Sequence, residues 1–193
     1  MSYKINLLIS DFDGTLVDTF QANFAAYQEA FQQCGYKLSI EQYRACFGFR
    51  FDKFMDYMHI YDNDTRKKIK EIKGEVYPQY FHHLKINTSL LAFIKSFKIN
   101  GGKTAVASTA RRKNLMNALD YIEASNYFDL VLSGEDVSKG KPNPEIYLKV
   151  LEYFQMEPEE ALVFEDSEVG ITAAENAGIS YIEINKKFYG NRG

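Results

Sequence analysis

The chain is poor in cysteine and contains no long uninterrupted apolar segment. Its two cysteines, Cys34 and Cys46, match no metal-binding spacing, so we expect neither a disulfide framework nor a thiolate-ligated metal. The N-terminal stretch MSYKINLLIS has too short an apolar run for a secretory signal peptide. No stretch approaches the roughly 20 apolar residues that a membrane span needs. We therefore expect a soluble cytoplasmic protein with no membrane partner.

The chain also lacks an excess of positive charge, internal repeats and low-complexity segments. Its formal net charge is −3, which offers no electrostatic basis for binding nucleic acid. Hydrophobic residues make up 46% of the 193 residues, enough to bury a core. This length suits one ordinary domain, or a core domain that carries a smaller insertion.

Short apolar runs alternate with helical patterns over most of the chain. Helical spacing of apolar residues occurs in Asn114–Glu123, Glu145–Phe154 and Ser167–Ala177. Such alternation predicts an α/β fold, a doubly wound parallel sheet with helices on both faces. The five predicted strands are Ile5–Ser10, Thr104–Ala107, Leu130–Leu132, Ala161–Phe164 and Tyr181–Ile184.

Residues from about 18 to 86 break this alternation and contain helical patterns alone. The predicted helices are Thr19–Cys34, Ser39–Cys46, Phe49–His59 and Thr65–Leu84, with Thr19 and Ser39 as caps and a kink at Pro78. We therefore expect a catalytic core formed by residues 1–17 and 87–193. An all-helical domain of residues 18–86 would be inserted after the first strand.

Two predicted strands end in pairs of carboxylates. Asp11 and Asp13 follow the first strand, and Glu165 and Asp166 follow the fourth. In a doubly wound sheet of strand order 3-2-1-4-5, these two strand ends would be neighbours at the topological switch point. Clustered carboxylates repel one another unless a cation neutralises them, and oxygen-only ligands suit Mg²⁺. The alternative for each pair alone is helix capping or a turn.

Two further segments carry polar groups suited to phosphate. Ser108 and Thr109 stand at a strand-to-helix turn, where hydroxyl and backbone N–H groups can bind a phosphate. Lys141 lies between Gly140 and Pro142, and it could neutralise the charge of a phosphate or of a nucleophile. An ordinary helix cap and a surface turn are the respective alternatives.

Taken together, these segments resemble the four motifs of the haloacid dehalogenase-like (HAD) superfamily. DFDGTLVDT, VAST, GKPNPEIY and VFEDSEVGITAAENAG occur in the family's order, and the resemblance extends over nearly the whole chain. It implies a Rossmann-like core with a C1-type helical cap, as in phosphoglycolate phosphatases and beta-phosphoglucomutases. One departure is the segment Lys85–Ser89, which replaces the Pro-Gly turn often found at the return from the cap.

The resemblance implies a role for each matching residue. Asp11 would be the nucleophile and a metal ligand, and Asp13 the general acid and base, with its backbone carbonyl on the metal. Asp166 would be a metal ligand, with Glu165 in or next to the metal shell. The implied phosphate- and substrate-binding residues are Gly14, Thr15, Ser108, Thr109, Lys141 and Arg50. Arg50 is as readily explained as a surface arginine beside core phenylalanines.

These inferences predict a Mg²⁺-dependent phosphoric monoester hydrolase that acts on a small phosphorylated metabolite through an aspartyl-phosphate. We expect a monomer or a weak homodimer. A sugar-phosphate mutase is one alternative, although Asn23 replaces the histidine that beta-phosphoglucomutases carry there. A dehalogenase is another, but dehalogenases of this superfamily lack the aspartate that is present as Asp13. A non-catalytic binding protein on the same fold is the third.

Overall fold

The computed structural model describes residues 4–185 and residue 189. The chain divides into two compact units, one formed by Met1–Asp18 with Lys85–Gly193 and the other by Thr19–Leu84. Within the described residues, every helix is too short or too polar to cross a membrane. The first unit contains the sheet, and the second is built from helices.

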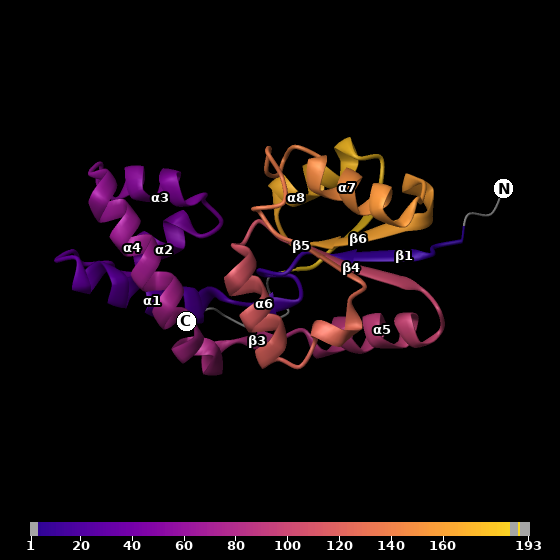
Figure 1. Ribbon diagram of the computed structural model, residues 1–193, viewed down its shortest axis with the longest axis horizontal. Helices are drawn as coiled ribbons and strands as arrows, with labels where there is room; N and C mark the ends of the chain where they lie inside the picture. Colours follow the sequence, from indigo (N-terminus) through magenta and orange to yellow (C-terminus); the bar gives the residue numbers. More distant parts are fainter. Residues whose placement is uncertain (1–3, 186–188, 190–193) are drawn as a thin grey trace. The chain divides into compact units, whose positions relative to one another are not determined.

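The core of the first unit is a parallel five-stranded sheet (Figure 1). Its strands are β1 (Leu7–Ser10), β4 (Lys103–Ala107), β5 (Leu130–Leu132), β6 (Ala161–Glu165) and β7 (Ser180–Glu183). They are arranged in the order β5-β4-β1-β6-β7, which confirms the predicted order 3-2-1-4-5. The central strand β1 pairs with β4 on one side and β6 on the other, and its four residues are buried.

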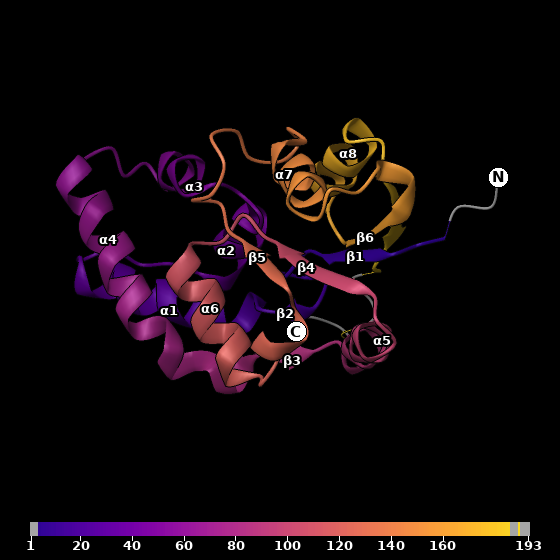
Figure 2. The same cartoon turned by 45° about the vertical axis from the view of Figure 1, so that its right-hand side comes forward.

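Helices cover both faces of this sheet. Figures 1 and 2 show α7 (Glu145–Phe154) and α8 (Glu168–Asn176) on one face, with α5 (Thr88–Ile99) and α6 (Arg112–Tyr121) on the other. The short 3-10 helices η2 (Ser125–Tyr127) and η3 (Pro158–Glu160) precede β5 and β6. The face under α7 and α8 is packed with small and branched side chains, among them Leu7, Ile9, Ala105, Ala107, Ile146, Val150, Val163, Ala173 and Ala174.

The second unit is held together by aromatic side chains. Its elements are α1 (Phe20–Gln33), α2 (Ile40–Cys46), α3 (Phe51–Tyr57), α4 (Asn63–Val76) and the 3-10 helix η1 (Tyr77–His83). Aromatic rings from α1, α2 and α3 meet in its interior, for example Phe31 stacked on Phe54 with ring centroids 5.5 Å apart. Offset and edge-to-face pairs of this kind stabilise a core beyond their burial.

Several predicted helix features in this unit are confirmed, and others are wrong. Ser39 caps α2, because its side chain accepts a hydrogen bond from the Gln42 backbone N–H at 3.2 Å. Thr19 occupies the predicted N-cap position of α1, but its side chain makes no capping hydrogen bond there. The helix predicted over Thr65–Leu84 changes from α to 3-10 geometry at Tyr77, because Pro78 has no N–H to continue the α-helical pattern.

Several elements of the first unit were not predicted. Helix α5 begins after Asn87, whose side-chain oxygen accepts a hydrogen bond from Leu90 N at 3.0 Å. The strands β2 (Val17–Asp18) and β3 (Lys85–Ile86) form a separate two-stranded antiparallel sheet. Strands of two residues are too short to show a periodic pattern.

Candidate active site

Three of the four predicted acids, all but Asp13, meet at the carboxyl ends of β1 and β6. Ser10 is level with Phe164 in the parallel pairing, so Asp11 follows β1 at the height where Glu165 ends β6. The Asp11 backbone N–H donates to the Phe164 carbonyl oxygen at 3.0 Å. Asp11, Glu165 and Asp166 are all buried, and each offers a carboxylate oxygen within 4.8 Å of the others. This cluster provides oxygen ligands for a divalent metal.

Lys141 brings a positive charge into this acidic cluster. Its ammonium lies 2.7 Å from Asp11 Oδ1 and 3.0 Å from the Ala107 carbonyl oxygen, and it also pairs with Glu165. The Lys141 side chain is 2% exposed, so solvent screens these contacts little. The loop residue predicted as the cationic group therefore reaches the predicted nucleophile directly.

Both oxygens of Glu165 are engaged by donors from the protein. Oε1 accepts from the Tyr147 hydroxyl at 2.8 Å and from Lys141. Oε2 accepts from Asp166 N and Ser167 Oγ, each at 3.1 Å. A Cβ atom at Gly170 would lie 2.0 Å from this carboxylate, so α8 packs directly against it. Glu165 is thus a fully buried, fully hydrogen-bonded counter-charge for Lys141.

Tyr147 is a member of this cluster that the sequence analysis did not identify. Its side chain is completely buried, its hydroxyl donates to Glu165, and its ring centre lies 5.1 Å from the Lys141 ammonium. A cation above an aromatic ring is attracted by the ring's electron-rich face. The tyrosine falls within the quoted motif GKPNPEIY, but helical periodicity there indicates no more than a core position.

The clustered charges shift the pKa values of the group. Burial, followed by repulsion from Glu165, raises the pKa of Asp11 well above its ordinary value, and the attraction of Lys141 offsets this only in part. Burial alone would lower the pKa of Lys141. Because Asp11 and other groups outweigh that effect, the Lys141 pKa lies well above its ordinary value. This shift favours the charged ammonium form of Lys141.

Gly14 and Thr15 shape the loop that follows Asp11. Gly14 has φ +100°, a left-handed conformation that favours glycine. A Cβ atom there would lie 2.3 Å from Asp166 Oδ2, so the loop backbone passes directly against that carboxylate. The Thr15 hydroxyl lies 3.3 Å from Asp166 Oδ1 and can donate to it. Gly14 and Thr15 thus hold the Asp166 carboxylate in position.

Asp13 and Ser108 lie next to each other at the same end of the sheet. The Ser108 hydroxyl is 3.4 Å from Asp13 Oδ2 and accepts a hydrogen bond from the Ala110 backbone N–H at 3.0 Å. Ser108 is fully buried, whereas Asp13 is partly exposed. Thr109, also predicted to bind phosphate, has an exposed side chain, and its carbonyl oxygen packs against Gly134.

Arg50 belongs to the other compact unit. It occupies the N-cap position of α3, where its side chain makes no capping hydrogen bond, and the residue is exposed. The structure thus brings Asp11, Asp13, Ser108, Lys141, Glu165 and Asp166 together within the first unit. The role predicted for Arg50 stays a prediction.

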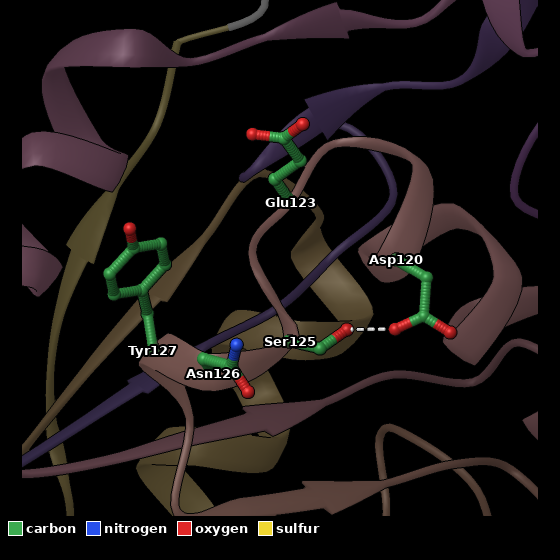
Figure 3. A pocket seen from close by; sticks show the side chains of 5 residues that line it. All are labelled: Asp120, Glu123, Ser125, Asn126 and Tyr127. Carbon is green, nitrogen blue, oxygen red and sulfur yellow. Dashed lines mark hydrogen bonds between the residues drawn. The ribbon is translucent and has the colours of Figure 1, made fainter.

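A hollow of about 470 Å³ lies between the end of α6 and η2. Figure 3 shows its lining residues, with the Ser125 hydroxyl bonded to Asp120 across one side. Glu123, Asn126 and Tyr127 complete the lining. The hollow shares no residue with the acidic cluster. We therefore assign it no role in catalysis.

Comparisons with known proteins identify the family. Residues 8–184 match the family described as haloacid dehalogenase-like hydrolase. The chain is 33% identical to the phosphorylated carbohydrates phosphatase of Thermotoga maritima, over 91% of this chain and 82% of that protein. It is 25% identical to the phosphoglycolate phosphatase of Aquifex aeolicus, over 95% of this chain and 89% of that protein.

A solved structure gives the same result. The crystal structure of CbbY from Rhodobacter sphaeroides in complex with phosphate superimposes with a TM-score of 0.85 at 25% identity, and the match covers 94% of this chain and 86% of that chain. The phosphatase names of the relatives support the predicted class of enzyme. The chain belongs to the haloacid dehalogenase-like hydrolase family, as its four motifs predicted.

Proposed function

We propose that the enzyme hydrolyses the phosphate monoester of a small phosphorylated metabolite, with Asp11 as the nucleophile and Mg²⁺ as the cofactor. The observation that carries this proposal is the convergence of Asp11, Asp166 and Lys141 at the ends of two adjacent strands. Phosphoryl transfer depends mainly on positioning and on neutralisation of charge. A buried carboxylate beside a fixed cation and a set of oxygen ligands supplies both.

The donor set fits a hard divalent cation. Asp11, Glu165 and Asp166 crowd three carboxylates against the one ammonium of Lys141, which leaves an excess of negative charge in a buried site. Burial, and after it repulsion from Glu165, raises the pKa of Asp11. Asp11 and Asp166 would hold Mg²⁺ together with the Asp13 backbone carbonyl. The bound ion would supply further charge neutralisation for the phosphate oxygens.

Catalysis then proceeds in two displacements. An Asp11 carboxylate oxygen attacks phosphorus, and the bond from phosphorus to the ester oxygen breaks. Asp13 gives its proton to the departing alcohol oxygen. A water molecule next attacks phosphorus, Asp13 accepts a proton from that water, and the Asp11–phosphorus bond breaks to release inorganic phosphate. The aspartyl-phosphate divides one difficult step into two easier ones.

Lys141 and Ser108 would hold the phosphoryl group during this sequence. The Lys141 ammonium contacts Asp11 Oδ1, so it stands beside the atom at which negative charge changes. The Ser108 hydroxyl lies within reach of Asp13 and would donate to a phosphoryl oxygen. Preorganised donors of this kind stabilise the transition state without reorganising during the reaction.

Glu165 would lie beside the metal ligands without contacting the metal itself. Its two oxygens already accept from Lys141, Tyr147, Asp166 N and Ser167 Oγ, so we assign it the positioning of Lys141. Carboxylates that do not touch the metal or the substrate commonly orient the groups that do. The predicted set of four metal-binding residues is accordingly divided into three ligands and one supporting acid.

The substrate class rests on the relatives. Their names specify phosphorylated carbohydrates and phosphoglycolate, which supports a small phosphorylated metabolite as the substrate. The helical unit Thr19–Leu84 would act as a cap domain and supply specificity, with Arg50 as a candidate for a second anionic group of the substrate. Replacing Arg50 with alanine should then raise KM for that substrate alone.

Phosphate release from p-nitrophenyl phosphate tests the proposal. We expect turnover with Mg²⁺ and none in excess EDTA, followed by selective hydrolysis of one or a few compounds in a panel of sugar phosphates and phosphorylated carboxylates. Full activity in EDTA would refute the metal requirement. Conversion of beta-glucose 1-phosphate to glucose 6-phosphate faster than phosphate release would show a mutase instead.

A further inference from the structure

The loop that carries Lys141 is fastened to helix α7 by a second acid, Glu145. One Glu145 oxygen, Oε1, accepts from the Ser138 backbone N–H at 2.9 Å, and the other, Oε2, accepts from the Lys139 backbone N–H at 2.8 Å. The Ser138 hydroxyl lies 3.0 Å from Oε1. A carboxylate held by two successive backbone N–H groups is a strong, charge-assisted arrangement.

The Glu145 carboxyl is ionised over the pH range in which activity would be measured. The backbone hydrogen bonds from Ser138 and Lys139 are the main cause that lowers the pKa of Glu145 to about 2. The fastening is therefore present at every pH at which activity would be measured.

The remainder of the loop is tied at its other end. The Glu145 backbone N–H donates to Asn143 Oδ1 at 3.1 Å, and Asn143 N donates to the Gly140 carbonyl oxygen at 3.1 Å. The Pro142 carbonyl oxygen accepts from the Asn176 side chain at 3.3 Å. Lys141 thus projects from a short segment whose two sides are both hydrogen-bonded, and Glu145 contributes to each side.

We infer that Glu145 is a positioning residue, which holds the loop so that the Lys141 ammonium stays at the nucleophile. Glu145 has no hydrogen bond to Asp11, Glu165 or Asp166 among those of the described residues, so it acts through the backbone of the loop. The catalytic consequence rests on the proposed function, whereas the positioning itself does not.

Chemical labelling of lysine tests the positioning without reference to activity. The protein would be treated with an acetylating N-hydroxysuccinimide ester, and labelling of each lysine followed by mass spectrometry. In the wild type we expect Lys139, which is exposed, to react quickly, and Lys141, whose side chain is 2% exposed, to stay protected. In Glu145→Ala, the rate at Lys141 should approach that at Lys139.

The matched control is Glu152→Ala. Glu152 is an exposed acid on the same helix, and its replacement should leave Lys141 protected. Glu145→Gln keeps the size of the side chain, but its amide group would face one of the two N–H donors, so an intermediate labelling rate is expected. If Glu145→Ala failed to fold, Glu145→Gln would carry the test by the same readout.

Activity provides the second readout. Loss of a supporting group of this kind typically lowers activity about 10- to 100-fold, and we expect the loss in kcat for p-nitrophenyl phosphate with folding unchanged. An active wild type whose Glu145 variants keep both full kcat and a protected Lys141 would overturn the inference. An inactive wild type with Lys141 released in Glu145→Ala would instead refute the proposed function and leave the positioning role standing.

Discussion

At the level of single residues, Gly14 lies in close contact with the Asp166 carboxylate. Gly14→Ala would set a Cβ atom 2.3 Å from Asp166 Oδ2 and displace that carboxylate. We expect the Mg²⁺ concentration for half-maximal activity to rise by about 10-fold or more, the scale on which metal-site neighbours act. A titration of activity with Mg²⁺ measures this directly.

Gly101→Ala is the control for that substitution. Gly101 has φ +88°, close to the φ +100° of Gly14, but a Cβ atom there would meet nothing within 4 Å. Both variants carry similar backbone strain, so only Gly14→Ala should change the metal requirement. If both variants needed equally more Mg²⁺ for half-maximal activity, backbone strain would be the cause and the contact with Asp166 would not.

The two aspartates of the first motif should fail in different ways. Asp11→Asn should abolish turnover, because an amide cannot serve as the attacking carboxylate. Asp13→Asn should keep Asp11 in place and slow both displacements, since it removes the proton donor and acceptor. Steady-state phosphate release measures both variants. Near-normal turnover in Asp11→Asn would show that Asp11 is not the nucleophile.

These two aspartates, Ser108 and Asp166 could be predicted because each stands where a short apolar run ends. The edge of a parallel sheet gathers such residues, so the strand pattern alone predicts their meeting. Lys141 was predicted on a different ground, its place between Gly140 and Pro142. Tyr147 and Glu145 could not be selected in either way. Their partners, Glu165 and the amides of Ser138 and Lys139, are reached through the docking of α7, which no local pattern specifies.

At the scale of elements, Asp129 joins α5, β4 and the start of β5. Its carboxylate accepts from the Lys98 ammonium at 2.9 Å and from Thr104 N at 3.0 Å. Asp129→Asn should reduce the free energy of unfolding by about 1–3 kcal/mol, the usual cost of breaking a charge-assisted bond. Urea denaturation at neutral pH measures the loss.

The pH dependence of that loss has a definite sign. Burial alone would raise the pKa of Asp129, but the bonds from Lys98 and Thr104 outweigh it and lower the pKa. A carboxyl whose pKa is lower in the folded state stabilises the fold above its unfolded value of about 3.9. The difference in unfolding free energy between wild type and Asp129→Asn should therefore be full at neutral pH. It should shrink as the pH falls below the unfolded pKa of about 3.9. A difference that stays constant down to pH 3 would contradict this explanation.

Elements with long patterns were predicted well, and short or composite ones were not. Glu145–Phe154 was predicted with both of its ends correct, because its apolar stripe is strong and a proline precedes it. The strand β7 is Ser180–Glu183, one residue earlier than predicted, because its four residues are exposed and no buried apolar pattern marks its ends. The pairing of β2 with β3 depends on two segments far apart in sequence, so no local property could indicate it.

At the scale of the whole molecule, the buried acidic cluster should make stability depend on the cation. The folded chain groups Asp11, Glu165 and Asp166 within 4.8 Å, whereas the unfolded chain does not. A ligand at 100 times its dissociation constant stabilises the folded state by about 2.7 kcal/mol. We expect Mg²⁺ to raise the melting temperature of the wild type, and to raise that of Asp166→Asn much less. Equal shifts in both proteins would place the ion elsewhere.

The small β2–β3 ribbon has a consequence for how this chain could be rebuilt. Asp18 stands directly opposite Lys85 in antiparallel register, so the chain leaves the sheet-containing unit and re-enters it one strand spacing apart, about 5 Å. That gap is what a two-residue hairpin turn closes. A short Asn-Gly turn could therefore join the two ends, and the 66 residues of Thr19–Leu84 behave topologically as a detachable module. Exchange of that module between relatives would leave the path of the host chain unbroken.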